Sequence, residues 1–275
     1  MAYIEKAEYG QVIRQVLQLV AKLEELGYHP TVSQVEELLH TLGLRKEDGK
    51  GYTAVDVVDL SAGFISLNTR SKQMRIRSPI LNCHIQEENF RNNIKETIVR
   101  ASMRYLSQED FYSGACTSSA ALKERFQNHP FLSLAARIIS VYTSKVHRPH
   151  NIMKDFLRFS SHTGSIDSYL QAADAWPYQD DATYDELEKA DERWDYSPRE
   201  YSPIHLAAHI VGGRYLIEAL LQQGNDITAA TQNGQTALHI AVEIENESGF
   251  ESVKLLVQYG ADIGYLDAYD LSECA

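Results

Sequence analysis

The sequence predicts a mainly α-helical protein that carries one small two-stranded hairpin and ends in a short stack of helical repeats. Three observations support this fold class. Apolar residues recur at three- and four-residue steps through most of residues 1–173. Two short segments between residues 63 and 77 have the character of strands joined by a turn. A sequence motif that begins near Tyr201 recurs 34 residues later.

Residues 1–84 are predicted to form a winged-helix-like region that opens with a helix. The apolar residues of segment 5–26 lie on one helix face, and Gly27 follows as a stop signal. A second helix is expected after Thr31 or Ser33, because either hydroxyl can accept a hydrogen bond from the first turn.

A two-stranded wing is expected after these helices. A short helix around residues 55–60 precedes a strand over 63–68, and a second strand follows over 73–77. Helix, helix, short helix and hairpin form the outline of a winged-helix module. The wing carries four basic residues, Arg70, Lys72, Arg75 and Arg77. Alternate residues of a strand project to one side, so a basic stripe that contacts nucleic acid is geometrically possible.

Residues 85–173 are predicted to be a helical connector, and residues 174–200 an acidic linker or cap. Helical periodicity runs through the connector, whereas two tryptophans, two prolines and a run of acids follow Asp174. The net charge is +3 over residues 1–173, −7 over 174–200 and −8 over 201–275. We therefore expect the last hundred residues to repel nucleic acid and anionic membranes.

The sequence carries no signal for a membrane span, secretion, disulfides or a metal. No apolar run approaches the roughly 20 residues of a membrane span, and the N-terminus lacks the layout of a secretory signal. An intracellular, cytoplasmic location is expected. Cys83, Cys116 and Cys274 have no C-x-x-C spacing. The adjacent pair Cys83 and His84 leaves a metal site open as an alternative to an ordinary loop, and we expect no metal or cofactor.

The residues of the repeated sequence motif have identifiable structural roles. The first copy is Ser-Pro-Ile-His-Leu-Ala-Ala from Ser202, and the second is Thr-Ala-Leu-His-Ile-Ala-Val from Thr236. Ser202 and Thr236 can cap a helix, and Pro203 suits the first helical position. The pattern resembles the ankyrin repeat, whose signature is T-P-L-H-x-A and then a second helix. The resemblance implies that His205 and His239 join hydrogen-bond networks between adjacent turns and do not act in catalysis.

Residues 201–275 are predicted to hold two full ankyrin units and a partial third, which begins at Ala261. A repeat stack normally needs three or more units. Support is therefore expected from elsewhere: from a packed interface between the first unit and the segment before it, and, at the open C-terminal edge, from a partner, a second copy of the chain or a missing continuation. Glu200 stands where the first unit's finger glycine is expected, which predicts that this unit abuts the preceding segment.

Residues 55–146 are similar to the segment that follows the NACHT nucleotide-binding domain in fungal NACHT–ankyrin proteins. They carry, in order, an S-A-G-hydrophobic strand from Ser61, "YL" at Tyr105, F-x-S-G from Phe111 and a helix with paired alanines. In that family a winged helix and a connector join an ATP-driven switch to a sensor array. A phosphate-binding loop needs G-x-x-x-x-G-K-[ST], and "GLRKEDGKG" has the wrong spacing. The resemblance implies that this chain corresponds to the C-terminal part of such a switch protein. The NACHT domain would then be supplied by another chain, or have been lost.

The sequence favours a non-enzymatic protein–protein interaction module. It contains no G-x-S-x-G elbow and no H-E-x-x-H pair, so no catalytic residue is predicted. In the ankyrin family, partner contacts fall at finger tips and on the exposed side of first helices. The matching positions are Gln232, Asn233, Gln235, Glu243, Ile244, His209, Ile210, Tyr265 and Tyr269. The alternative is a winged-helix nucleic-acid-binding protein that uses the basic wing at Arg70–Arg77.

Overall fold

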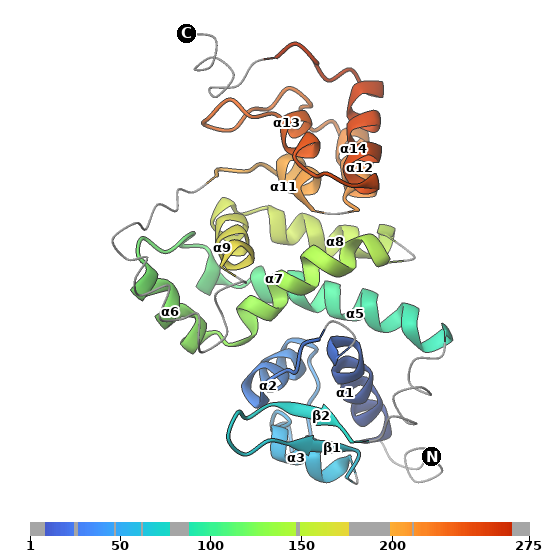
Figure 1. Ribbon diagram of the computed structural model, residues 1–275, viewed down its shortest axis with the longest axis vertical. Coiled ribbons are helices and arrows are strands. Elements are labelled where there is room, and N and C mark those ends of the chain that lie inside the picture. Colours follow the sequence, from blue (N-terminus) through green and yellow to red (C-terminus); the bar gives the residue numbers. More distant parts are fainter. Residues whose placement is uncertain are drawn as a thin grey trace.

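The computed structural model describes residues 9–24, 27–46, 48–61, 63–77, 88–146, 149–175, 199–210 and 212–265. Three groups of elements follow one another along the long axis of the molecule (Figure 1): an N-terminal group with the hairpin, a central helical group and the C-terminal repeats. The described part is mainly helical with one two-stranded sheet, as the sequence predicts. Within these ranges, no helix has the length and apolar character to cross a membrane.

The N-terminal group consists of three helices and one antiparallel hairpin. Its elements are α1 (Tyr9–Glu24), α2 (Val32–Thr41), α3 (Ala54–Leu60), β1 (Ile65–Leu67) and β2 (Met74–Ile76). Thr31 caps α2, because its hydroxyl accepts the Gln34 N–H while the Gln34 side chain accepts the Thr31 N–H. The predicted order of elements is confirmed, whereas membership of the winged-helix family stays a prediction.

A small core of its own stabilises this group. It consists of Val16, Leu17, Val20, Val35, Leu39, Tyr52, Val57, Ile65 and Met74. Glu37 of α2 links the group to the centre of the molecule. Its carboxylate accepts the hydroxyl of Tyr105 at 2.8 Å and the backbone N–H of Phe131 at 2.7 Å.

The central group is built around a helix that is buried on almost every side. Its helices are α5 (Glu88–Leu106), α6 (Ser119–Asn128), α7 (Phe131–Tyr142), α8 (Pro149–Ser160) and α9 (Thr163–Asp174), with 3-10 turns η1 (Glu109–Phe111) and η2 (Thr143–Lys145). Nine of the twelve residues of α7 are buried, because apolar side chains occupy most of its surface. It packs against α5 and α9.

An ion-pair network fixes α8 against α5. Asp155 lies 2.6 Å from Arg100 Nε and 2.8 Å from Arg104 Nε, and its side chain is almost fully buried. Burial alone would raise the pKa of Asp155, but the bonds from Arg104 and Arg100 outweigh it and lower that pKa. The carboxylate therefore stays charged between two helices that are about 50 residues apart in the sequence.

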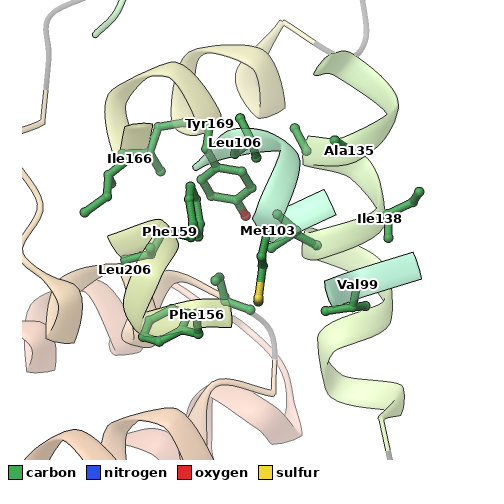
Figure 2. Close-up of a cluster of buried hydrophobic side chains, with 14 of the residues drawn as sticks. Val99, Met103, Leu106, Ala135, Ile138, Phe156, Phe159, Ile166, Tyr169 and Leu206 are labelled. Atoms are coloured by element: carbon green, nitrogen blue, oxygen red, sulfur yellow. The ribbon is translucent and has the colours of Figure 1, made fainter. Parts of the chain in front are cut away.

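The C-terminal repeats are two stacked helix pairs. The first pair is α11 (Pro203–His209) with α12 (Arg214–Gln222), and the second is α13 (Ala237–Val242) with α14 (Glu247–Gln258). α11 packs on α13, α12 packs on α14, and both helices of the first pair contact α8. One hydrophobic core runs without a break from the central helices into the repeats. Figure 2 shows Leu206 of α11 beside Phe156 and Phe159 of α8, so the repeats have a packed junction with the central helices.

Candidate interaction surface of the repeats

The histidine of the first unit ties two successive turns together. The backbone N–H of Ser202 donates to His205 Nδ1 at 3.1 Å, and His205 Nε2 lies 2.9 Å from the carbonyl oxygen of Ala229 in the next finger. Because Nδ1 accepts a hydrogen bond, Nε2 carries the proton and donates. Burial lowers the pKa of His205, which favours this neutral form.

The second unit repeats this arrangement. The Thr236 N–H donates to His239 Nδ1 at 3.1 Å, and His239 Nε2 lies 3.0 Å from the carbonyl oxygen of Tyr265. The structural role that the ankyrin resemblance implies for both histidines is therefore confirmed. With both ring nitrogens engaged by the backbone, neither imidazole is placed to act as a general base.

Glu200 has the backbone conformation that glycine adopts in the second unit. Gly234 lies in the finger between the units with φ of 80°, and Glu200, 34 residues earlier, has φ of 51°. Side chains other than glycine rarely adopt this left-handed conformation. Asp167 of α9 holds the segment in place, because its carboxylate accepts the Arg199 N–H at 3.1 Å and also the Glu200 N–H. The start of the first unit is thus held against α9 of the connector. Most of the directly preceding segment, which the sequence predicts this unit to abut, lies outside the described residues.

Arg199 organises a polar cluster where α9 meets the repeats. Its Nη2 lies 2.7 Å from Asp174, its Nη1 lies 3.4 Å from His209 Nε2, and its guanidinium lies 5.9 Å from the ring centroid of Tyr201. Sequence reasoning missed this cluster. Asp167 and Arg199 are far apart in the sequence, and the one local signal was Glu200 at a glycine position.

The predicted contact residues of the first unit lie inside this junction. The Ile210 side chain is 1% exposed, so its placement on an exposed contact face is wrong. His209 is half-buried, and its ring lies against those of Tyr169 and Tyr201. Burial, together with the nearby Arg199 charge, lowers the pKa of His209 to about 4. For His209 the cause is the connector, because Tyr169 of α9 lies against its ring.

The predicted contact residues of the second unit lie at the surface or partly buried. Gln232 and Asn233 are exposed at the finger tip. The Gln235 side-chain amide donates to the Glu243 carboxylate at 3.0 Å, which joins the finger to the end of α13. Ile244 is half-buried beside them. We call Gln232, Asn233, Gln235 and Glu243 the finger face.

The last finger is described only as far as Tyr265. The Tyr265 side chain is exposed, while its carbonyl oxygen is engaged by His239. Tyr269 lies outside the described residues, so its role stays a prediction.

The four basic residues of the hairpin are all exposed: Arg70, Lys72, Arg75 and Arg77. Met74 is fully buried and Ile76 half-buried on the core side of β2, so Arg75 and Arg77 project to the opposite side. The predicted basic stripe is therefore present, with Arg75 on β2 and Arg77 directly after it. Its contact with nucleic acid remains untested.

No arrangement of metal ligands is found in the part of the chain that the structure describes, where no three His, Cys, Asp or Glu residues gather. Cys116 is buried, and its N–H donates to the Gln171 side chain at 2.8 Å. Burial raises the pKa of the Cys116 thiol, which disfavours the reactive thiolate. Cys83, His84 and Cys274 lie outside the described residues.

Comparison with known proteins supports the geometry of the repeats. Residues 180–267 match a family model described as ankyrin repeats (3 copies). Residues 180–267 contain ankyrin repeats. The match begins within the segment that the sequence predicted as an acidic linker or cap, 174–200, and most of that segment lies outside the described residues. No curated protein and no solved structure matches the chain. Ankyrin repeats suggest a protein–protein interaction module.

Proposed function

We propose that this chain is a non-enzymatic interaction module that binds a protein partner through the finger face of its second ankyrin unit. The observation that supports this most strongly is the different surroundings of the two units. The first unit packs against α8, whereas Gln232, Asn233 and Glu243 of the second are exposed. Polar groups held on rigid elements and open to solvent are suited to recognise a partner with little loss of conformational entropy.

We further propose that the module is the connector and sensor end of a NACHT-type signalling switch. The support is the resemblance of residues 55–146, together with the continuous core that joins the central helices to the repeats. A packed junction of this kind could carry a binding event at the repeats to a motor domain on another chain. The proposal includes that this chain itself binds no ATP, and a calorimetric titration that detects Mg·ATP binding would contradict it.

Alanine substitution at the finger face tests the interaction. The variant combines Gln232→Ala, Asn233→Ala and Glu243→Ala. A matched control combines Gln127→Ala, Asn128→Ala and Glu124→Ala, which removes the same three residue types from the exposed side of α6. We expect quantitative affinity capture to lose partners with the first variant and keep them with the second. If both variants retain every partner of the parent chain, the finger face is not the binding surface.

A second candidate function is nucleic-acid binding by the hairpin, which the exposed stripe at Arg75 and Arg77 favours. The net charge of −12 opposes it at long range. On this alternative, Arg75→Ala with Arg77→Ala would weaken DNA binding and flatten its salt dependence, as measured by fluorescence anisotropy. DNA retention that does not change with these substitutions would exclude the hairpin as the binding site.

A further inference from the structure

We propose that two copies of this chain associate through an arginine pair on the hairpin of one copy and a glutamate pair on the second ankyrin unit of the other. The arginine pair is Arg75 and Arg77, and the glutamate pair is Glu245 and Glu247. The glutamate pair lies outside the finger face, and the contact does not depend on the proposed function. The partner is a second copy of the chain.

Both pairs have the spacing of alternate residues in an extended backbone. Arg75 lies in β2 and Arg77 directly after it, so the two side chains project to the same side, about 7 Å apart along the strand. Asn246, between the two glutamates, is also extended, with φ of −152° and ψ of 175°. Each arginine can therefore face one glutamate at the same time.

The backbone of both pairs is held in place within its own copy. On the hairpin, the N–H of Ile76, between the two arginines, donates to Glu24 Oε1 at 2.9 Å. On the repeat, the side chain of Asn246 accepts the N–H of Ser248 at 2.9 Å and caps α14. Neither backbone has to be ordered when two copies meet, which lowers the entropic cost of association.

All four side chains are exposed, and each pair lies in a stretch of one charge sign. No acid occurs between Asp59 and Glu87, whereas Lys254 is the single lysine or arginine from residue 215 to residue 275. Among the described residues, none of the four forms an ion pair. The hairpin and the second ankyrin unit lie at opposite ends of the molecule (Figure 1), so the two pairs do not meet within one copy.

An exposed aromatic ring beside the glutamate pair favours arginine as its partner. Phe250 follows Glu247 by three residues on α14, so the two share one helix face, and Phe250 is 65% exposed. A guanidinium can bond a carboxylate through two N–H groups and also stack on an aromatic ring, which suits it to this site better than an ammonium. The chain itself carries two arginines at the matching spacing.

A second copy fits the arginine pair better than a nucleic acid does. A polyanion would meet the net charge of −12 and the exposed Asp59 of α3, the helix that packs on β1. Repulsion between two whole chains is largely screened beyond about 8 Å at physiological salt, whereas the two ion pairs act in direct contact. The local complementarity of the two pairs therefore decides the contact.

Two charge-reversal variants of the full chain test the contact. One combines Arg75→Glu with Arg77→Glu, and the other combines Glu245→Lys with Glu247→Lys. By sedimentation equilibrium of protein freed of nucleic acid, we expect each variant alone to self-associate at least about tenfold more weakly than the parent, because like charges then face each other. An equimolar mixture of the two should recover the association, since each variant supplies the charges that complement the other.

Controls with the same charge changes elsewhere separate the contact from net charge. Lys154→Glu with Arg158→Glu, at exposed sites on α8, matches the first variant. Glu109→Lys with Asp110→Lys, at exposed sites on η1, matches the second. We expect both controls to self-associate within about twofold of the parent. None of these variants alters the finger face, whose own test is separate.

Three results would overturn the proposal. The first is a parent chain that stays monomeric at about 1 mM protein and about 0.05 M salt. The second is a mixture that stays monomeric although both variants keep the circular dichroism spectrum of the parent. The third is association only in preparations that retain nucleic acid, which would assign the arginine pair to that ligand.

The salt dependence of the parent decides the question if a charge-reversal variant does not fold. Ion pairs at a surface weaken as salt rises, so we expect self-association to fall at least about tenfold between about 0.05 M and about 1 M salt. Association that does not change over this range would exclude the contact.

Discussion

Gly212 and Gly224 form a matched pair that tests how closely the ankyrin units approach the connector. Both lie in the left-handed region, with φ of 83° and 84°. A Cβ at Gly224 would meet nothing within 4 Å, whereas a Cβ at Gly212 would lie 2.3 Å from the Ser144 Cα and 2.9 Å from its backbone nitrogen. Ser144 belongs to η2 of the connector, so the glycine permits backbone to approach backbone.

The expected costs follow from these surroundings. Alanine in the left-handed region costs about 1–2 kcal/mol, which is the whole expected effect of Gly224→Ala. Gly212→Ala adds an overlap that only a backbone shift relieves, worth about a further 1–3 kcal/mol. Urea denaturation followed by circular dichroism measures both free energies of unfolding. If the two variants are equally destabilised, the close approach at Ser144 does not exist in solution.

Three further predictions concern the same scaffold. Asp155→Ala should lower the free energy of unfolding by about 2–4 kcal/mol, because it leaves Arg100 and Arg104 without their shared partner. In the same denaturation assay, the control Asp110→Ala at an exposed site should change that free energy by less than about 0.5 kcal/mol. Glu200→Gly should raise the free energy of unfolding by about 0.5–1 kcal/mol in the same assay, because glycine adopts the left-handed backbone conformation without strain. A lower free energy of unfolding in this variant would show that Glu200 is not strained. Acidification should destabilise the fold through His209, whose pKa is about 4 in the folded chain and about 6.5 in the unfolded chain. Between these pH values the unfolded chain binds more protons, so the free energy of unfolding falls as the pH drops, by about 2 kcal/mol at pH 5. His209→Gln should remove that share of the pH dependence, while His162→Gln at an exposed site should not.

Local signals were sufficient to predict most helices and their caps. Thr31 and Thr236 begin helices because a hydroxyl before an apolar run can accept a first-turn N–H, and the structure shows both capping boxes. The left-handed backbone at Glu200 was also predictable, because the equivalent position of the second unit is Gly234. These features depend on residues within a few positions of each other.

Features that depend on distant contacts were not predictable. Ile210 and Ile244 occupy equivalent positions of the two units, yet one is buried and the other half-buried. The two units also differ in their surroundings, because both helices of the first unit pack against α8. The Arg199 cluster likewise needs α9 and the first ankyrin unit to come together. A single repeat pattern could not reveal which of its copies faces solvent.

The most direct measurement of the central claim is site-specific photo-crosslinking in cells that express the full chain. A photoreactive residue is placed at position 233, on the finger face, and in a parallel experiment at position 128, at the exposed end of α6. Binding through the second ankyrin unit predicts discrete protein adducts from position 233 and none from position 128. Equal adducts from both positions, or adducts from position 128 alone, would contradict it.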